Sequence, residues 1–106
     1  MFVAINYISC KEHYTQKFED LFATRAKAID TMPGFHHMQV LKPATSEDPY
    51  LIVSHWDKKE DFETWTRSEA FIKGHKRGFA DIIEAREKGL EPPMTSQFKT
   101  YNVISE

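Results

Sequence analysis

The residue best suited to chemistry in this sequence is His75, because it falls in the apolar stripe of an expected helix. At the ~100° turn per residue of a helix, its side chain lies about 40° from those of Phe71 and Phe79. Gly74 and Gly78 carry no side chains, so a flat, bulky molecule could lie against the backbone beside it. A neutral imidazole here could be an axial ligand for heme iron. A half-buried histidine hydrogen-bonded to a loop fits the same spacing, so geometry alone leaves both interpretations open.

Two further residues have types that suit a binding site. Asn6 lies among apolar residues on one face of an expected strand. An unpaired buried amide costs about 1 to 3 kcal/mol, so its side chain must bond either to a strand-edge carbonyl or to a ligand. Trp65 shares an apolar stripe with Phe62 and Ile72, and taken alone it fits a core position. Neither residue is decisive by itself.

The segments that must position these residues follow from hydrophobic periodicity and turn signals. Asp57, with Glu60 three residues later, is typical of a capping box at a helix start. The expected elements are a strand over 1–9, a helix over 12–32, strands over 35–42 and 50–56, helical segments over 57–66 and 68–79, and a strand over 97–104. This order predicts an α+β chain with the ferredoxin-like βαββαβ arrangement.

Helices in such a unit cover one face of the sheet. The first strand is largely apolar on both faces, with Phe2, Ala4, Asn6 and Ile8 on one face and Val3, Ile5 and Tyr7 on the other. Soluble monomers seldom expose large apolar patches, so we expect a homodimer in which two sheets close into a barrel. A mixed, solvated second face is the alternative.

Composition excludes several classes of protein. The 106 residues contain 14 Lys and Arg against 16 Asp and Glu, a net charge of -2, which argues against a nucleic-acid partner. Cys10 is the only cysteine, so the chain has no internal disulfide, no multi-thiolate zinc site and no CxxCH attachment of heme. The sequence shows neither a signal-peptide pattern nor an apolar run of about 20 residues, so we expect no membrane association and a cytoplasmic location.

The stretch SHWDKKEDFETWTRSEAFIKGHK, residues 54–76, resembles the segment that marks small bacterial heme-degrading monooxygenases of the Isd type, within the antibiotic biosynthesis monooxygenase (ABM) superfamily. It has a strand ending in Trp-Asp, a helix with an inward Trp, the pattern S-x-A-F, and a histidine ten residues after that Trp. Members also carry an Asn in the first strand, as Asn6 does here. Where the family commonly has alanine before the histidine, this chain has Gly74, which affects the fit of the pocket and not the chemistry. The resemblance covers residues 1–106 as a single ABM-type domain.

The resemblance implies a role for each residue. His75 would ligate iron from the proximal side, as the metal ligand, and Asn6 would donate a hydrogen bond toward the iron-bound ligand or its neighbour. Trp65 would press on the porphyrin and help to ruffle it, and Phe71 would join these three in contacting heme. Heme would be both cofactor and substrate, the ring being opened with O2 and electrons and the iron released.

Other histidines and motifs suggest no second cofactor. His36 and His37 are adjacent in an expected strand, so they point to opposite faces and cannot chelate one metal as a pair. His13 and His55 stand alone. Flavin, nicotinamide and nucleotide motifs are absent from the sequence, so electrons for a heme oxygenase would come from a separate reductase or a chemical reductant.

Two rival functions share these features. One is a cofactor-free monooxygenase or isomerase on the same dimeric barrel, which leaves His75 without a role. The other is a heme carrier or sensor, which has less need of Asn6 and Trp65. Heme degradation is the leading hypothesis because it uses all three residues. Four basic residues could pair with the heme propionates: Lys11, Lys73, Lys76 and Arg77. Charged residues beside an apolar stripe are usually the solvated edge of the helix, so none of them is assigned to a propionate.

Overall fold

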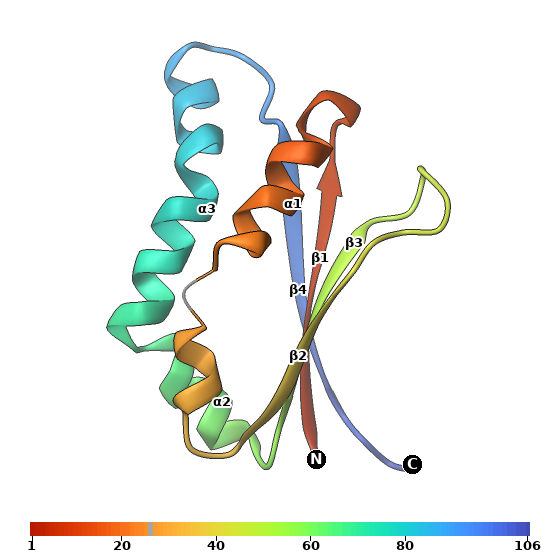
Figure 1. Ribbon diagram of the computed structural model, residues 1–106, viewed down its shortest axis with the longest axis vertical. Coiled ribbons are helices and arrows are strands. Elements are labelled where there is room, and N and C mark those ends of the chain that lie inside the picture. Colours follow the sequence, from red (N-terminus) through yellow and green to blue (C-terminus); the bar gives the residue numbers. More distant parts are fainter. Residues whose placement is uncertain (26) are drawn as a thin grey trace.

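The computed structural model describes residues 1–25 and 27–106. Four strands and three α-helices follow one another in the expected order (Figure 1). The strands are β1 (Phe2–Cys10), β2 (Phe35–Leu41), β3 (Tyr50–Trp56) and β4 (Met94–Asn102); the helices are α1 (Thr15–Ala23), α2 (Lys59–Thr66) and α3 (Glu69–Glu87), with 3-10 turns η1 (Glu12–Tyr14) and η2 (Ala28–Thr31).

The four strands form one sheet in the order β2-β3-β1-β4, and every neighbouring pair is antiparallel. β2 and β3 form the expected hairpin. The two chain-terminal strands, β1 and β4, lie side by side, and all helices lie on one face of the sheet (Figure 1). This topology confirms the predicted ferredoxin-like βαββαβ fold.

The core lies between the sheet and the helices in two separate clusters. One cluster lies under α1 and the C-terminal half of α3, and it contains Ile8, Tyr14, Phe18, Tyr50, Ile82 and Met94. The other lies at the opposite end of the sheet, where Phe2, Ile29 and Trp56 pack together. Trp56 is fully buried, and its indole donates a hydrogen bond to Ser54 Oγ at 3.0 Å. Because the two clusters do not merge, the middle of this layer is available for a pocket.

The predicted helix over residues 12–32 is wrong as a single element. It is divided into η1, α1 and η2, and Lys27 adopts a left-handed conformation with φ of 57°. A left-handed residue cannot continue a right-handed helix, so the chain turns before η2. The apolar spacing nevertheless continues across the turn because Ile29 packs into the second cluster. Ala26, which the expected helix included, lies outside the described residues.

The start of α2 also differs from the prediction. Asp57 does not cap it: α2 follows Lys58, whose side chain makes no capping hydrogen bond, and Asp57 instead contacts His36. A true cap occurs one helix later, where Ser68 Oγ accepts from Phe71 N at 3.1 Å. This bond fixes the start of the helix that carries His75.

Two of the remaining histidines, His37 and His55, pair across the hairpin of β2 and β3. A bulge separates Phe35 from His37 in the ladder, and the His36 ring contacts Asp57. His55 does not stand alone, because its ring stacks on that of His37 with centroids 4.1 Å apart. Within the described ranges, no group of three or more His, Cys, Asp or Glu side chains could hold a metal. None of the helices described is long and apolar enough to cross a membrane.

Candidate functional site

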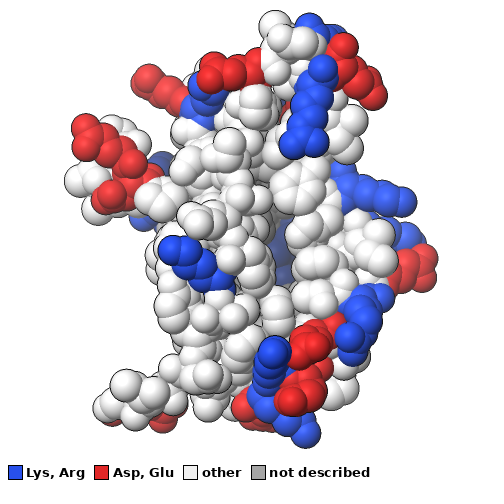
Figure 2. Space-filling view, turned by 180° about the vertical axis from the view of Figure 1, so that it is seen from behind, with Lys and Arg blue, Asp and Glu red and all other residues white. Residues whose placement is uncertain are grey.

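A pocket of about 450 Å³ lies between the sheet and α3, with residues of both core clusters in its walls. This volume falls within the ~300 to 1,000 Å³ typical of small-molecule sites. Figure 2 shows the molecule hollowed in the middle of a largely uncharged surface. The chamber is therefore apolar and open on one side, which suits a large, flat, apolar ligand.

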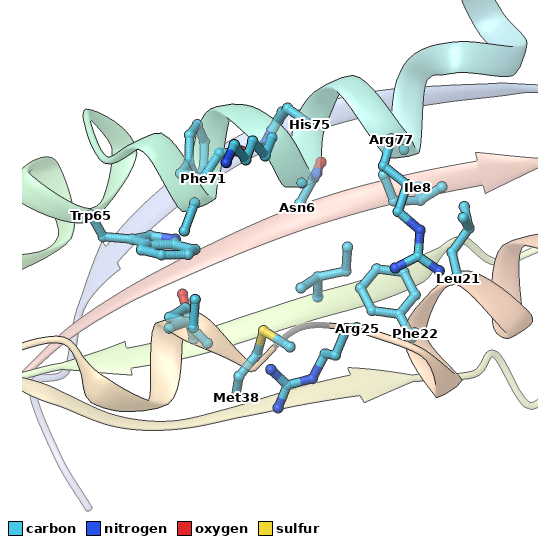
Figure 3. Close-up of a pocket in the computed structure, with 18 of the residues that line it drawn as sticks. Asn6, Ile8, Leu21, Phe22, Arg25, Met38, Trp65, Phe71, His75 and Arg77 are labelled. Carbon is cyan, nitrogen blue, oxygen red and sulfur yellow. The ribbon is translucent and has the colours of Figure 1, made fainter.

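His75 faces this pocket from α3 (Figure 3). Its Nδ1 lies 3.2 Å from the carbonyl oxygen of Phe71, and because a carbonyl only accepts, Nδ1 carries the proton. In the neutral imidazole, this tautomer leaves a lone pair on Nε2. The imidazole lies between two aromatic rings, with centroid distances of 4.0 Å to Phe71 and 5.3 Å to Phe79. A histidine whose Nδ1–H is held by a carbonyl is the usual arrangement for metal ligation through Nε2.

The two glycines of α3 leave the expected space beside this imidazole. Both Gly74 and Gly78 line the pocket. A Cβ added to either residue would meet no protein atom within 4 Å, so no neighbouring side chain fills the surface around them. The helix therefore presents bare backbone to the pocket on both sides of His75.

Asn6 enters the pocket from the opposite wall, which is formed by β1 of the sheet (Figure 3). It pairs across the sheet with Ile52 and Phe98, so its neighbours on this face are apolar. Its Oδ1 atom is buried and has no hydrogen-bond partner among the described residues. An amide oxygen only accepts, so a strand-edge carbonyl could pair only with Nδ2 of Asn6, and the unpartnered Oδ1 needs a donor. A buried polar atom aimed into a pocket indicates a ligand.

Trp65 and Phe71 form one end of the pocket. Their rings meet edge to face with centroids 5.6 Å apart. Trp65 also packs against the core cluster of Phe2, Ile29 and Trp56, so it is a core residue and a pocket residue at once. A large aromatic held in this way presents a rigid surface to a bound ligand.

Hydrogen bonds between elements hold the framework of the pocket. Tyr14, at the start of α1, donates to Asp81 of α3 at 2.6 Å. Burial and this bond raise the pKa of Tyr14, and the same bond, with Lys17 nearby, lowers the pKa of Asp81. Tyr50 of β3 donates to Glu19 of α1 at 2.6 Å. These contacts join α1 to α3 and to the sheet at the end of the layer where Tyr14 and Tyr50 belong to the same core cluster.

The structure brings all four predicted site residues, Asn6, Trp65, Phe71 and His75, to one pocket. The candidate propionate partners separate into two groups. Lys73 and Arg77 line the pocket, whereas Lys76 does not and Lys11 pairs with Glu91 at 3.0 Å.

Sequence reasoning missed two lining cations, Arg25 and Lys27. A signal for Arg25 existed, because it is the charged residue in the apolar stripe of the expected first helix.

An antiparallel α+β fold with an apolar pocket under its helices is typical of small ligand-binding domains. The family model described as antibiotic biosynthesis monooxygenase matches residues 1–77 of the chain. The chain therefore belongs to the antibiotic biosynthesis monooxygenase family. Its curated relatives include proteins of the Isd type, as the sequence resemblance predicted.

Two relatives are similar over most of the chain. The heme oxygenase (mycobilin-producing) of Mycobacterium tuberculosis is 36% identical over 76 residues, which are 70% of this chain and 72% of that protein. The heme oxygenase (staphylobilin-producing) of Staphylococcus haemolyticus is 35% identical over 79 residues, 72% of this chain and 74% of that protein.

Two solved structures share the fold. The heme-degrader MhuD from Mycobacterium tuberculosis, with two hemes bound in its active site, superposes with a TM-score of 0.71 at 27% identity over 100% of this chain and 98% of that chain. SnoaB, a cofactor-independent oxygenase from Streptomyces nogalater, superposes with a TM-score of 0.75 at 16% identity, covering 99% and 94% of the two chains. At that identity, the likeness to SnoaB concerns the fold alone.

Proposed function

We propose that this protein is a heme-degrading monooxygenase, which binds heme as both cofactor and substrate, opens the porphyrin with O2 and electrons, and releases iron. The observation that carries the proposal is the pairing of two polar groups in one apolar pocket. His75 can offer a lone pair on Nε2 from the helix wall, and Asn6 has a buried, unpartnered amide oxygen on the sheet wall. The names of the relatives support the same activity.

In this proposal His75 is the iron ligand. The carbonyl of Phe71 fixes the tautomer of His75 and the direction of its ring. Gly74 and Gly78 allow the macrocycle to approach the helix backbone, and the Phe71 ring contacts the macrocycle beside the ligand.

Asn6 and Trp65 act on the opposite side and at one end of the pocket. Through Nδ2, Asn6 would donate to a small polar molecule between the sheet and the macrocycle, and Oδ1 would accept from it, in a position otherwise surrounded by apolar side chains. Trp65 is fixed by Phe71 and by the core, so a ring pressed against it must bend rather than displace it. Heme, when bound, supplies the oxygen chemistry, and the chain supplies orientation, ring shape and a dry site.

The proposal also covers the oligomeric state, the electron donor and the location of the protein. One domain over residues 1–106 carries the site, and two copies join through their open sheet faces into a homodimer. A separate reductase delivers the electrons. The cytoplasm, where Cys10 stays a thiol, is the proposed location.

The test is a turnover assay on purified protein loaded with hemin, reduced with ascorbate in air. Loss of the Soret band together with release of iron to a chelator is expected for the wild type, and His75→Ala should lose the sharp Soret complex and turnover while keeping only weaker binding of hemin. A Soret complex that survives reduction in air would instead identify a carrier or sensor. If no saturable complex forms, the heme proposal fails and the cofactor-free oxygenase becomes the better hypothesis.

A further inference from the structure

The pocket is lined by four cationic side chains and, within the described part of the chain, by no Asp or Glu. We call Arg25, Lys27, Lys73 and Arg77 the cationic rim. The whole chain has a net charge of -2, so this segregation is specific to the pocket. Basic atoms are visible in the hollow of Figure 2. An apolar chamber with a positive rim is complementary to a ligand that has an apolar body and carboxylates at its edge.

Two members of the cationic rim are already matched by acids. Arg25 lies 3.6 Å from Asp30, and Lys73 lies 3.1 Å from Glu69. The Lys73 ammonium is also largely exposed, which weakens any ion pair that it makes. These two residues set the sign of the local potential, but they are not the strongest candidates for a direct contact with a ligand.

Arg77 differs because both of its hydrogen-bond acceptors are neutral. Its Nη1 donates to the carbonyl oxygen of Thr24 at 3.0 Å, and its Nη2 donates to the Thr24 hydroxyl. No carboxylate pairs with it among the described residues. A guanidinium has five N–H donors, so Thr24 fixes the group and leaves three donors for a ligand. A held, uncompensated guanidinium is well prepared to bind a carboxylate.

We propose that Arg77 binds a carboxylate of the substrate and thereby selects planar macrocycles that carry free carboxylates at one edge. This inference rests on the proposed function, in which the macrocycle is heme and the carboxylates are its propionates. It makes Arg77 a specificity-determining residue.

The position of Arg77 relative to His75 supports this role. Arg77 follows His75 by two positions, which places it about 3 Å further along the axis of α3 and about 200° around it, so its long side chain reaches the pocket from the other side of the helix. The Arg77 side chain extends from α3 toward Leu21 and Phe22 of α1, to one side of His75 (Figure 3). Since the iron lies at the centre of a porphyrin and the propionates at its edge, a cation for the propionates must lie beside the iron ligand. Two attachment points on one helix would also fix the rotation of the ring in the pocket.

The experiment compares two probes, hemin and hemin dimethyl ester, whose carboxylates are capped. Dissociation constants are measured from Soret and tryptophan-fluorescence titrations of the wild type, Arg77→Gln, Arg77→Lys and His75→Ala. Lys76→Gln is the matched control, because Lys76 neighbours Arg77 but does not line the pocket. For the wild type we expect tighter binding of the free acid. Arg77→Gln should weaken hemin binding about tenfold, with little change for the ester, since a charged hydrogen bond is lost only with the acid.

The variants separate this inference from the proposed function. Arg77→Lys should retain part of the preference for the acid, and Lys76→Gln should retain all of it. His75→Ala should weaken both probes equally and keep their ratio; if it changes neither, the iron ligand of the proposed function fails while the role of Arg77 stands. Equal weakening of acid and ester by Arg77→Gln, or an equal effect of Lys76→Gln, would overturn the assignment to Arg77.

Discussion

At the scale of single residues, Asn6 is where stability and the proposed function conflict. A buried amide oxygen without a partner costs about 1 to 3 kcal/mol relative to a satisfied one, and the neighbours of Asn6 across the sheet, Ile52 and Phe98, offer it nothing. A polar group that destabilises its own surroundings and faces a pocket is expected to be retained for what it does to a ligand.

Replacing Asn6 with leucine should therefore separate the two effects. Asn6→Leu is expected to raise the free energy of unfolding by about 1 kcal/mol, because the unsatisfied amide is removed, and to lower heme turnover. Urea unfolding and the turnover assay measure the two quantities. Asn102→Leu, at an exposed position of β4, is the control and should change neither. A loss of stability in Asn6→Leu would show that the amide has a structural partner.

His55 gives a second prediction at this scale, on pH. Burial, and then the proximity of His37 and His36, lower the pKa of His55 from its ordinary value of 6.5. The unfolded chain consequently binds a proton at a higher pH than the folded chain does. Stability should fall as the pH drops through about 6.5 and level off below the folded pKa.

The measurement is the urea midpoint between about pH 8 and pH 5.5. His55→Gln should flatten this profile, and His13→Gln, at an exposed site, should leave it unchanged. Glu19 and Asp81, whose pKa values are lowered, lose their contributions only at more acid pH. A profile as steep in His55→Gln as in the wild type would contradict the assignment.

At the scale of elements, the start of α3 determines where His75 points. Ser68→Ala removes the hydroxyl that accepts from Phe71 N, and we expect a loss of about 1 kcal/mol in the free energy of unfolding. Asp57→Ala is the contrasting variant. Asp57 makes only an exposed contact with His36, so its loss should matter less. Chemical denaturation of both variants measures the two losses in the free energy of unfolding. A larger loss for Asp57→Ala than for Ser68→Ala would support the helix cap at Asp57 that the sequence suggests.

The same elements show what the sequence could and could not predict. The strands and the order of the helices were predictable, because an element that is buried on one face repeats its apolar residues every two positions in a strand and every three to four in a helix. The break of the first helix at Lys27 was missed, since Ile29 keeps helical spacing while packing into a different cluster. The pocket position of His75 was predictable from its stripe. The contacts of Arg77 with Thr24 were not, because they join residues 53 positions apart.

At the scale of the whole molecule, the prediction of a homodimer rests on the open face of the sheet. None of the described helices covers this face (Figure 1), and exposed aromatic and aliphatic side chains such as Tyr101 and Leu41 lie on it. Apolar surface of this kind is expected to be buried against a second copy. Ile5 lies in the central strand β1, so a charge there would face the partner.

Ile5→Asp should accordingly convert a dimer to a monomer in light scattering coupled to size-exclusion chromatography. Ile83→Asp, on an exposed position of α3, is the matched control and should remain dimeric. A monomeric wild type at micromolar concentration, or dissociation of both variants alike, would contradict a dimer built on this sheet face.

A crystal structure of the hemin complex would show whether His75 binds heme iron inside this pocket. We expect porphyrin density between α3 and the sheet, a bond from His75 Nε2 to the iron, and Asn6 on the opposite side of the ring. Porphyrin bound elsewhere, or iron ligated by another side chain, would contradict this proposal.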